Sequence, residues 1–173
     1  VGADVTKRKE HERNYAHLYD TLIDDNPDII ASIKVNITHD YCDMKSNRGI
    51  AVYDIEKNLT INEFMEMFCD RLVNQKIRGE VLERFSKEAL LKSYQEGESV
   101  LSSDFLVRRK DGDTLWIRGF VNLIENPYTS ELEGILYAND ITASKMRSAI
   151  IEHIMGERYD YGATIDVEDE SLR

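Results

Sequence analysis

Apolar and polar residues alternate on both sides of Asp111-Gly112, within residues 100–142. Alternation with a period of two is typical of half-buried β-strands, and an Asp-Gly pair readily takes the positive φ angles of a tight hairpin turn. Asn126-Pro127 opens a polar segment that closes at Gly134, and residues 135–139 return to a strand pattern. The pattern therefore predicts three consecutive antiparallel strands.

The last predicted strand leads directly into Asp140, Ile141 and Thr142, where short polar side chains favour a helix start. An amphipathic stretch follows, so we expect the sheet to end by starting a helix. Its apolar positions are Met146, Ile150, Ile151, Ile154 and Met155.

Two more strands are predicted near the N-terminus. Residues 31–37 alternate between apolar and polar side chains, which indicates a half-buried strand. Residues 41–45 and 49–53 can form the next strand around a Ser-Asn-Arg-Gly turn at residues 46–49.

Two helices are predicted between these strands and the later three. Thr60 and Glu63 have capping-box spacing before a helix that we expect to reach about Leu72. A second helix is predicted from Ser86 to the residue before Gly97, with Ala89, Leu90 and Tyr94 buried. The fold class is therefore α+β, with a five-stranded antiparallel sheet, helices mainly on one face, and a linker helix on each side.

Composition narrows the class of protein. A chain of 173 residues with 42% hydrophobic content can form one globular domain. Its net charge of −11 repels nucleic acid and anionic lipid, so we expect no nucleic-acid partner and no direct membrane contact. Cys42 and Cys69 are too few for a disulfide framework and lack zinc-site spacing. We expect a cytoplasmic domain, although its parent protein can still be membrane-anchored.

Three segments, RRKDGDTLWIRG, NPYTSELEG and ILYANDITASK, resemble the C-terminal half of a PAS domain. The resemblance is densest over residues 105–145 and extends more weakly back to about Asn26. It implies a non-catalytic sensory and dimerisation module of a bacterial signalling protein, with a diguanylate cyclase or a sensor histidine kinase as parent. Such a module relays conformational change through linker helices to an output domain, which the sequence does not contain.

A short repeat suggests tandem PAS units. Asp4-Val5-Thr6 with Lys9 matches Asp140-Ile141-Thr142 with Lys145, 136 residues later. Chance similarity of two short motifs is the alternative. The expected division is residues 1–6 as the tail of a preceding PAS unit, 7–25 as a linker helix, 26–142 as the complete PAS-like domain, 143–158 as a second linker helix and 159–173 as the start of a following unit.

No cofactor is predicted. Haem-binding PAS domains use a histidine from the helical segment over the pocket, and residues 58–97 contain none. Flavin photoreceptors of this family carry a reactive cysteine in an Asn-Cys-Arg-Phe context, which Cys69 lacks. We therefore disfavour haem and flavin and predict no metal, while a small-molecule ligand remains an option. We expect side chains of the long helical segment to fill the pocket, with the candidate lining Phe64, Phe68, Leu90, Ile117 and Val121.

Both faces of the central predicted strand carry apolar residues. Trp116 and Phe120 share one face, while Ile117 and Val121 share the other. The second face then needs a cover, which predicts a homodimer; coverage by the N-terminal helix alone is the alternative. Neighbouring PAS and output domains of the parent chain are the other expected partners.

The predicted signal-carrying junction is the start of the C-terminal helix. We expect the Asp140 carboxylate to cap this helix and to pair with Arg118 on the neighbouring strand. The full predicted relay set is Asp140, Ile141, Thr142, Arg118, Trp116, Asp4 and Thr6. The alternative function is a small α+β ligand-binding protein or enzyme with a helical lid over a pocket.

Overall fold

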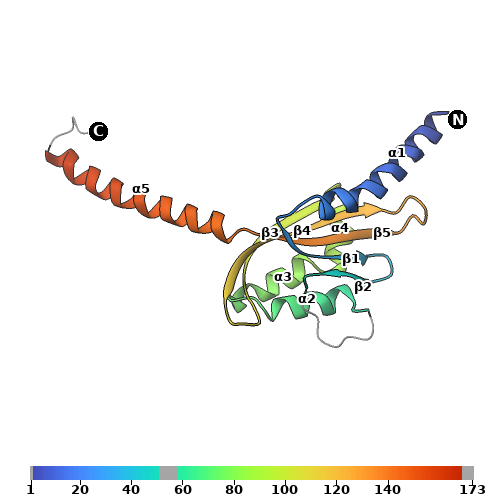
Figure 1. Ribbon diagram of the computed structural model, residues 1–173, viewed down its shortest axis with the longest axis horizontal. Coiled ribbons are helices and arrows are strands. Elements are labelled where there is room, and N and C mark those ends of the chain that lie inside the picture. Colours follow the sequence, from blue (N-terminus) through green and yellow to red (C-terminus); the bar gives the residue numbers. More distant parts are fainter. Residues whose placement is uncertain (1, 51–57, 169–173) are drawn as a thin grey trace. The chain divides into compact units, whose positions relative to one another are not determined.

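A five-stranded antiparallel sheet forms the centre of the computed structural model, which describes residues 2–50 and 58–168 (Figure 1). The strand order across the sheet is β2-β1-β5-β4-β3. The strands are β1 (Ile29–Asn36), β2 (Tyr41–Arg48), β3 (Val100–Arg108), β4 (Thr114–Glu125) and β5 (Leu132–Asp140). The helices are α1 (Gly2–Tyr19), the π-helical turn η1 (Asp20–Asp24), α2 (Ile61–Cys69), the short 3₁₀ turn η2 (Gln75–Ile77), α3 (Arg78–Arg84), α4 (Lys87–Gln95) and α5 (Thr142–Glu168). The predicted fold class is confirmed.

The predicted meander of three strands is also confirmed. β3 pairs with β4 from Val100↔Asn122 to Arg108↔Thr114, and Gly112 in the hairpin turn has a φ of 93°. Because glycine has no Cβ, it takes this left-handed conformation without steric cost. β4 then pairs with β5 from Ile117↔Asp140 to Glu125↔Leu132.

The core lies between one face of the sheet, here called the inner face, and helices α2, α3 and α4. Figure 1 shows α2 and α3 below the sheet and α1 above it, against the opposite, outer face. The pleat alternates side chains between the two faces, so every second residue of each strand enters the core. The largest side chains that are less than 2% exposed are Ile33, Ile37, Ile61 and Leu90.

Local capping signals correctly placed two helix starts. The Thr60 hydroxyl accepts from the Glu63 N–H at 3.1 Å, and the Glu63 carboxylate accepts from the Thr60 N–H at 2.8 Å. Ser86 caps α4 by accepting from the Ala89 N–H at 3.2 Å. These bonds satisfy N–H groups that the first helical turn leaves without intrahelical partners.

The chain after α2 differs from the prediction. α2 ends at Cys69, and Leu72 instead forms an antiparallel bridge with Val107 of β3. The Arg108 N–H donates to the Arg71 carbonyl at 2.9 Å, so this pairing replaces helical hydrogen bonds. The sequence did not predict α3, a helix of 7 residues.

The turn expected within the second strand is wrong. β2 extends through Arg48, but its pairing with β1 passes from Asp43, opposite Lys34, to Arg48, opposite Ser32, so residues 44–47 form an irregularity within the strand. The Ser46 hydroxyl accepts from the Lys34 N–H at 2.8 Å, which supports the strand where the turn was expected. Residues 51–53, the end of the predicted strand, lie outside the described residues.

The two ends of the chain are helical where other structure was expected. α1 already includes Asp4 and Thr6, and α5 continues through residues 159–168, where the sequence predicted a new strand. A helix satisfies its backbone N–H and C=O groups by hydrogen bonds within itself, whereas a strand needs a neighbouring strand. Among the described residues, no strand pairs with residues 159–168. The tandem arrangement of PAS units remains a prediction.

The chain divides into two compact units, residues 1–140 and 141–173. Among residues 2–50 and 58–168, no helix has both the length and the apolar character that a membrane crossing requires.

Candidate functional site: a cavity under the sheet

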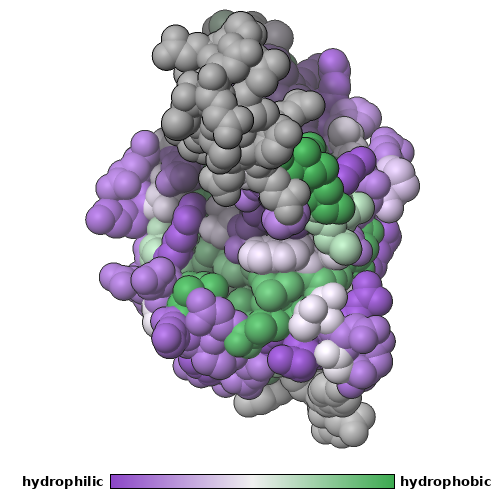
Figure 2. All heavy atoms as spheres, turned by 90° about the vertical axis from the view of Figure 1, so that its left-hand side faces the viewer, coloured by the Kyte–Doolittle hydropathy of each residue, from purple (hydrophilic) through white to green (hydrophobic). Residues whose placement is uncertain are grey.

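A cavity of about 440 Å³ lies between the inner face of the sheet, helix α2 and Phe85, the residue that follows α3. Figure 2 shows a hollowed apolar surface bordered by hydrophilic side chains. The volume falls within the range of about 300–1,000 Å³ that is typical of small-molecule sites. The apolar lining includes Phe64, Met67, Phe68, Phe85, Phe105, Leu115, Ile117, Val121, Leu136 and Ala138.

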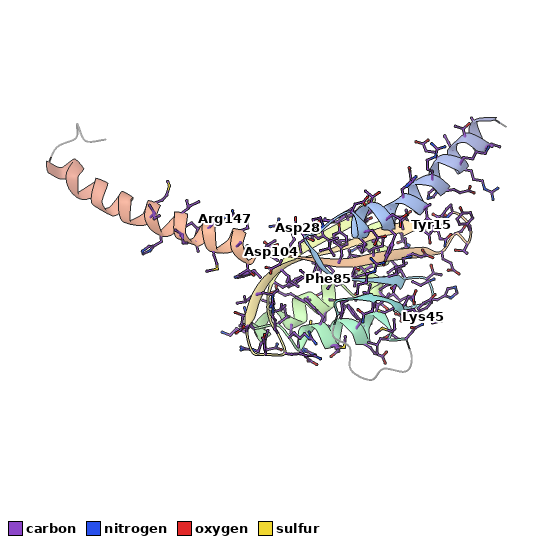
Figure 3. The ribbon with its side chains drawn as sticks, in the orientation of Figure 1. Tyr15, Asp28, Lys45, Phe85, Asp104 and Arg147 are labelled. Atoms are coloured by element: carbon purple, nitrogen blue, oxygen red, sulfur yellow. The ribbon has the colours of Figure 1, made fainter. Side chains whose placement is uncertain are left out.

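Aromatic rings form the side of the cavity near β3. Phe105 contacts Phe68 edge-on, with 5.2 Å between ring centroids, and Phe85 at 6.2 Å. Phe85 lies between the helices and the sheet (Figure 3). Gly119 of β4 lies beside Phe105, and a Cβ at this position would be 3.3 Å from the ring. The absent side chain lets Phe105 lie close to the strand.

The expectation that side chains fill the pocket is wrong. Of the candidate lining residues, Phe64, Phe68, Ile117 and Val121 border the cavity, whereas Leu90 belongs to the packed core and is 1% exposed. Sequence reasoning missed Phe105 and the β5 residues Leu136 and Ala138. Strand alternation could have identified them, because they share a face with residues that were recognised.

One side of the cavity is basic. Arg71, which follows α2, and Arg108, Arg109 and Lys110, at the end of β3, contribute to the lining. The described lining contains no aspartate or glutamate. Arg71 and Arg108 lie opposite each other across the short pairing of Leu72 with Val107. No local sequence pattern indicates this cluster, since it depends on a pairing between distant segments.

The described residues include no group of three or more His, Cys, Asp or Glu side chains that could hold a metal ion. Burial raises the pKa of both cysteine thiols, to about 12 for Cys42. Each thiol is therefore protonated near neutral pH and resembles a small core residue more than a nucleophile.

The outer face carries α1 on one side only. The Tyr15 hydroxyl on α1 donates to the Glu133 carboxylate of β5 at 2.5 Å, and Tyr15 points towards the sheet (Figure 3). Burial and this hydrogen bond both raise the pKa of Tyr15. The Lys34 ammonium lies 4.0 Å from the Tyr19 ring centre. Further along the same face, four apolar or aromatic side chains are only half-buried: Leu106, Trp116, Phe120 and Tyr137.

The fold of this chain is similar to that of solved sensory domains. A sensory box histidine kinase/response regulator from Burkholderia thailandensis is 15% identical, with 82% of this chain and 98% of that chain covered at a TM-score of 0.50. The N-terminal domain of a diguanylate cyclase with a PAS/PAC sensor from Marinobacter aquaeolei is 14% identical, with 66% and 97% covered at a TM-score of 0.41. The chain has the PAS fold. Neither a family model nor a curated protein matches the sequence.

In this PAS fold, the predicted pairing of Arg118 with Asp140 is wrong. Arg118 lies opposite Asn139, while Asp140 lies opposite Ile117, so their side chains emerge on different faces of the sheet. The Arg118 guanidinium instead donates to both oxygens of Asp104, at 2.7 and 3.1 Å. The Asp140 carboxylate is 4.0 Å from the Arg109 guanidinium.

The other predicted relay residues lie in different elements. Trp116 is on the outer face opposite Leu106, and Asp4 and Thr6 are on α1. Asp140 is the last residue of β5, and α5 starts at Thr142. A single residue, Ile141, thus separates the sheet from the C-terminal helix.

Proposed function

We propose that this chain is a non-catalytic sensory module of a signalling protein. Occupation of the cavity changes the sheet, and β5 passes that change to α5 and from there to an output domain. The PAS fold supports the sensory assignment by analogy only, because one fold can serve many functions. The resemblance of the sequence motifs favours a diguanylate cyclase or a sensor histidine kinase as the bacterial parent.

The observation that carries this proposal is the position of β5. Leu136 and Ala138 line the cavity, and two residues after Ala138 the strand ends. A ligand that contacts β5 differently in two states shifts the balance between those states. Because only Ile141 lies between β5 and α5, a change in the position of β5 would directly affect the start of the helix.

A cavity-filling variant tests the relay without knowledge of the ligand. Ala138→Leu adds apolar volume next to β5, where open space accepts it. In amide NMR spectra, we expect shifts in residues 132–140 that continue into residues 141–151. The matched control is Lys92→Leu, which adds an apolar group on an exposed position of α4. Shifts confined to the cavity would reject the relay.

We further propose that the module acts as a homodimer through the outer face. The supporting observation is the half-buried group of Leu106, Trp116, Phe120 and Tyr137 beyond the area that α1 contacts, with Phe120 stacked on Tyr137 at 4.8 Å. Exposed apolar groups of this kind often mark association surfaces. On α5, Met146, Ile150 and Ile154 are 60%, 57% and 53% exposed and offer additional area.

Sedimentation velocity at tens of micromolar tests the dimer. Leu106→Lys should give a monomer, while Tyr128→Lys, at an exposed position in the turn between β4 and β5, should leave the dimer intact. A wild-type monomer, or a Leu106→Lys variant that dimerises as well as the wild type, would reject the outer face as the interface.

A further inference from the structure

We infer that the cavity selects a neutral aromatic ligand of about two or three rings, which packs against the phenylalanine side chains of the lining. This inference rests on the proposed sensory function and deepens it by naming the ligand class. It depends on which side chains line this particular cavity, because the PAS fold itself does not fix them.

The first support is the kind of aromatic residue around the cavity. The sequence contains nine tyrosines and five phenylalanines. Four of the five phenylalanines line the cavity from its inner side: Phe64 and Phe68 on α2, Phe85 after α3 and Phe105 on β3. Tyr137 is the one tyrosine in the described lining, and its ring stacks on Phe120 on the outer face. The described rings that face the cavity therefore carry no hydroxyl group and offer a guest purely apolar contact.

The second support is the angle between these rings. Phe68 and Phe85 both meet Phe105 edge-on, with interplanar angles of 79° and 64°. Aromatic pairs prefer edge-to-face or offset-stacked contacts to a face-to-face sandwich. Rings at such angles present both edges and faces, so a planar aromatic guest can contact one ring at its face and the next at its edge. A saturated guest of the same size gains only the free energy of apolar burial.

The third support is the size of the cavity. An apolar cavity of about 150 Å³ accommodates one benzene ring. The volume of about 440 Å³ is roughly three times larger, which suits about two or three rings. Gly119 preserves part of this space, because a Cβ there would lie 3.3 Å from the Phe105 ring and would push the ring away from the strand.

The basic side chains at one end of the cavity do not provide an anchor for a charged ligand inside it. Strand alternation places the Arg108 side chain on the outer face. The Arg109 guanidinium has the Asp140 carboxylate 4.0 Å away, and Arg71 and Lys110 interact with other groups of the protein. A charged ligand would lose its hydration on entering the apolar interior, so a neutral ligand is favoured.

Amide NMR titration of the intact chain with three compounds of one carbon skeleton tests the inference. The compounds are 2-naphthalenemethanol, its saturated counterpart decahydro-2-naphthalenemethanol, and the anion 2-naphthoate. We expect the aromatic alcohol to shift cavity signals such as Gly119 and Ala138 and to bind about threefold or more tightly than the saturated alcohol. It should bind about tenfold or more tightly than 2-naphthoate, because the carboxylate must be desolvated. Benzyl alcohol, with a single ring, should bind more weakly because it buries less apolar area.

The variant pair is Phe68→Leu and Tyr128→Leu. Both replace an aromatic ring by an aliphatic side chain, but Tyr128 is exposed and does not line the cavity. Phe68→Leu should lower the preference for the aromatic over the saturated alcohol to about twofold or less, whereas Tyr128→Leu should leave it unchanged. Phe105→Leu removes a second ring of the lining and should act as Phe68→Leu does. Unchanged amide signals outside the cavity verify that each variant folds.

Each other outcome counts against the inference in its own way. Equal affinity for the aromatic and the saturated alcohol would reject selection of an aromatic ligand but keep an apolar ligand cavity and the proposed sensory function. Binding of 2-naphthoate as tight as that of the alcohol would reject a neutral ligand, and equally tight binding of benzyl alcohol would reject the number of rings. If none of the compounds shifts cavity signals, the ligand class is wrong, and the Ala138→Leu variant still decides separately whether the cavity communicates with α5.

Discussion

Gly49 offers a sharp test of the geometry at the end of β2, beside the cavity. Its φ is +73°, and a Cβ at this position would lie 2.1 Å from the Ile30 carbonyl oxygen and 3.2 Å from the Ala31 Cα. Gly97 also has a positive φ, of +88°, but no atom lies within 4 Å of its Cβ position. An alanine at Gly97 would therefore suffer backbone strain alone, whereas an alanine at Gly49 would suffer both backbone strain and a steric clash.

Gly49→Ala should be more destabilising than Gly97→Ala. The left-handed conformation costs an alanine about 1–2 kcal/mol, which applies to both variants. At Gly49, the Ile30 backbone must also move, and the loss of one hydrogen bond of the β1–β2 edge adds about 0.5–1.5 kcal/mol. The expected loss in the free energy of unfolding is about 1.5–3.5 kcal/mol for Gly49→Ala and about 1–2 kcal/mol for Gly97→Ala.

Urea unfolding measures this difference. Trp116 is the only tryptophan in the sequence and lies on β4, so its fluorescence reports on the sheet. The slope of the free energy against urea concentration should be the same for all three proteins, with only the midpoint changed. Equal losses for both variants would refute the clash with Ile30, and a loss below about 0.5 kcal/mol for Gly49→Ala would refute the left-handed conformation itself.

Three further predictions address local features. Thr60→Ala should lower the free energy of unfolding by about 0.5–2 kcal/mol, because it removes one half of the capping box of α2, and thermal unfolding checks this. In double-mutant cycles by urea unfolding, Arg118→Ala and Asp104→Ala should show measurable coupling, while Arg118→Ala and Asp140→Ala should be additive; coupling only in the second cycle would contradict the observed register. Burial raises the pKa of Cys42 to about 12, so the folded state favours the neutral thiol and its stability should fall as pH rises above about 8.5, the pKa of an unfolded cysteine. Cys42→Ala should show a weaker fall, and iodoacetamide should label Cys42 at pH 8 only after unfolding.

Features decided by a few neighbouring residues were predictable from the sequence. The Asp111-Gly112 turn and the capping box at Thr60 have local causes, since turn conformation and helix caps depend on side chains within three positions. The alternation of β4 likewise gave both of its faces correctly. Turn, helix cap and strand alternation thus each favour the same fold locally, as is typical of natural sequences.

Features that depend on register or on distant pairing were not predictable. A displacement of one residue in the pairing of β4 with β5 moves Asp140 to the face opposite Arg118, and the sequence does not fix that register. α3 is short and starts with Arg78-Gly79, so its helical form depends on packing of Val81 and Phe85 in the core. The cavity is a space between elements, and no local pattern encodes its volume.

Hydrogen–deuterium exchange of the whole chain, compared between the wild type and the cavity-filling Ala138→Leu variant, tests the central claim most directly. The account predicts slower exchange in cavity segments 61–72 and 100–121, in β5, and onward into residues 141–151 of α5, because β5 both lines the cavity and leads into the helix. Protection of the cavity segments with unchanged exchange in residues 141–151 would contradict the relay from the cavity to the C-terminal helix.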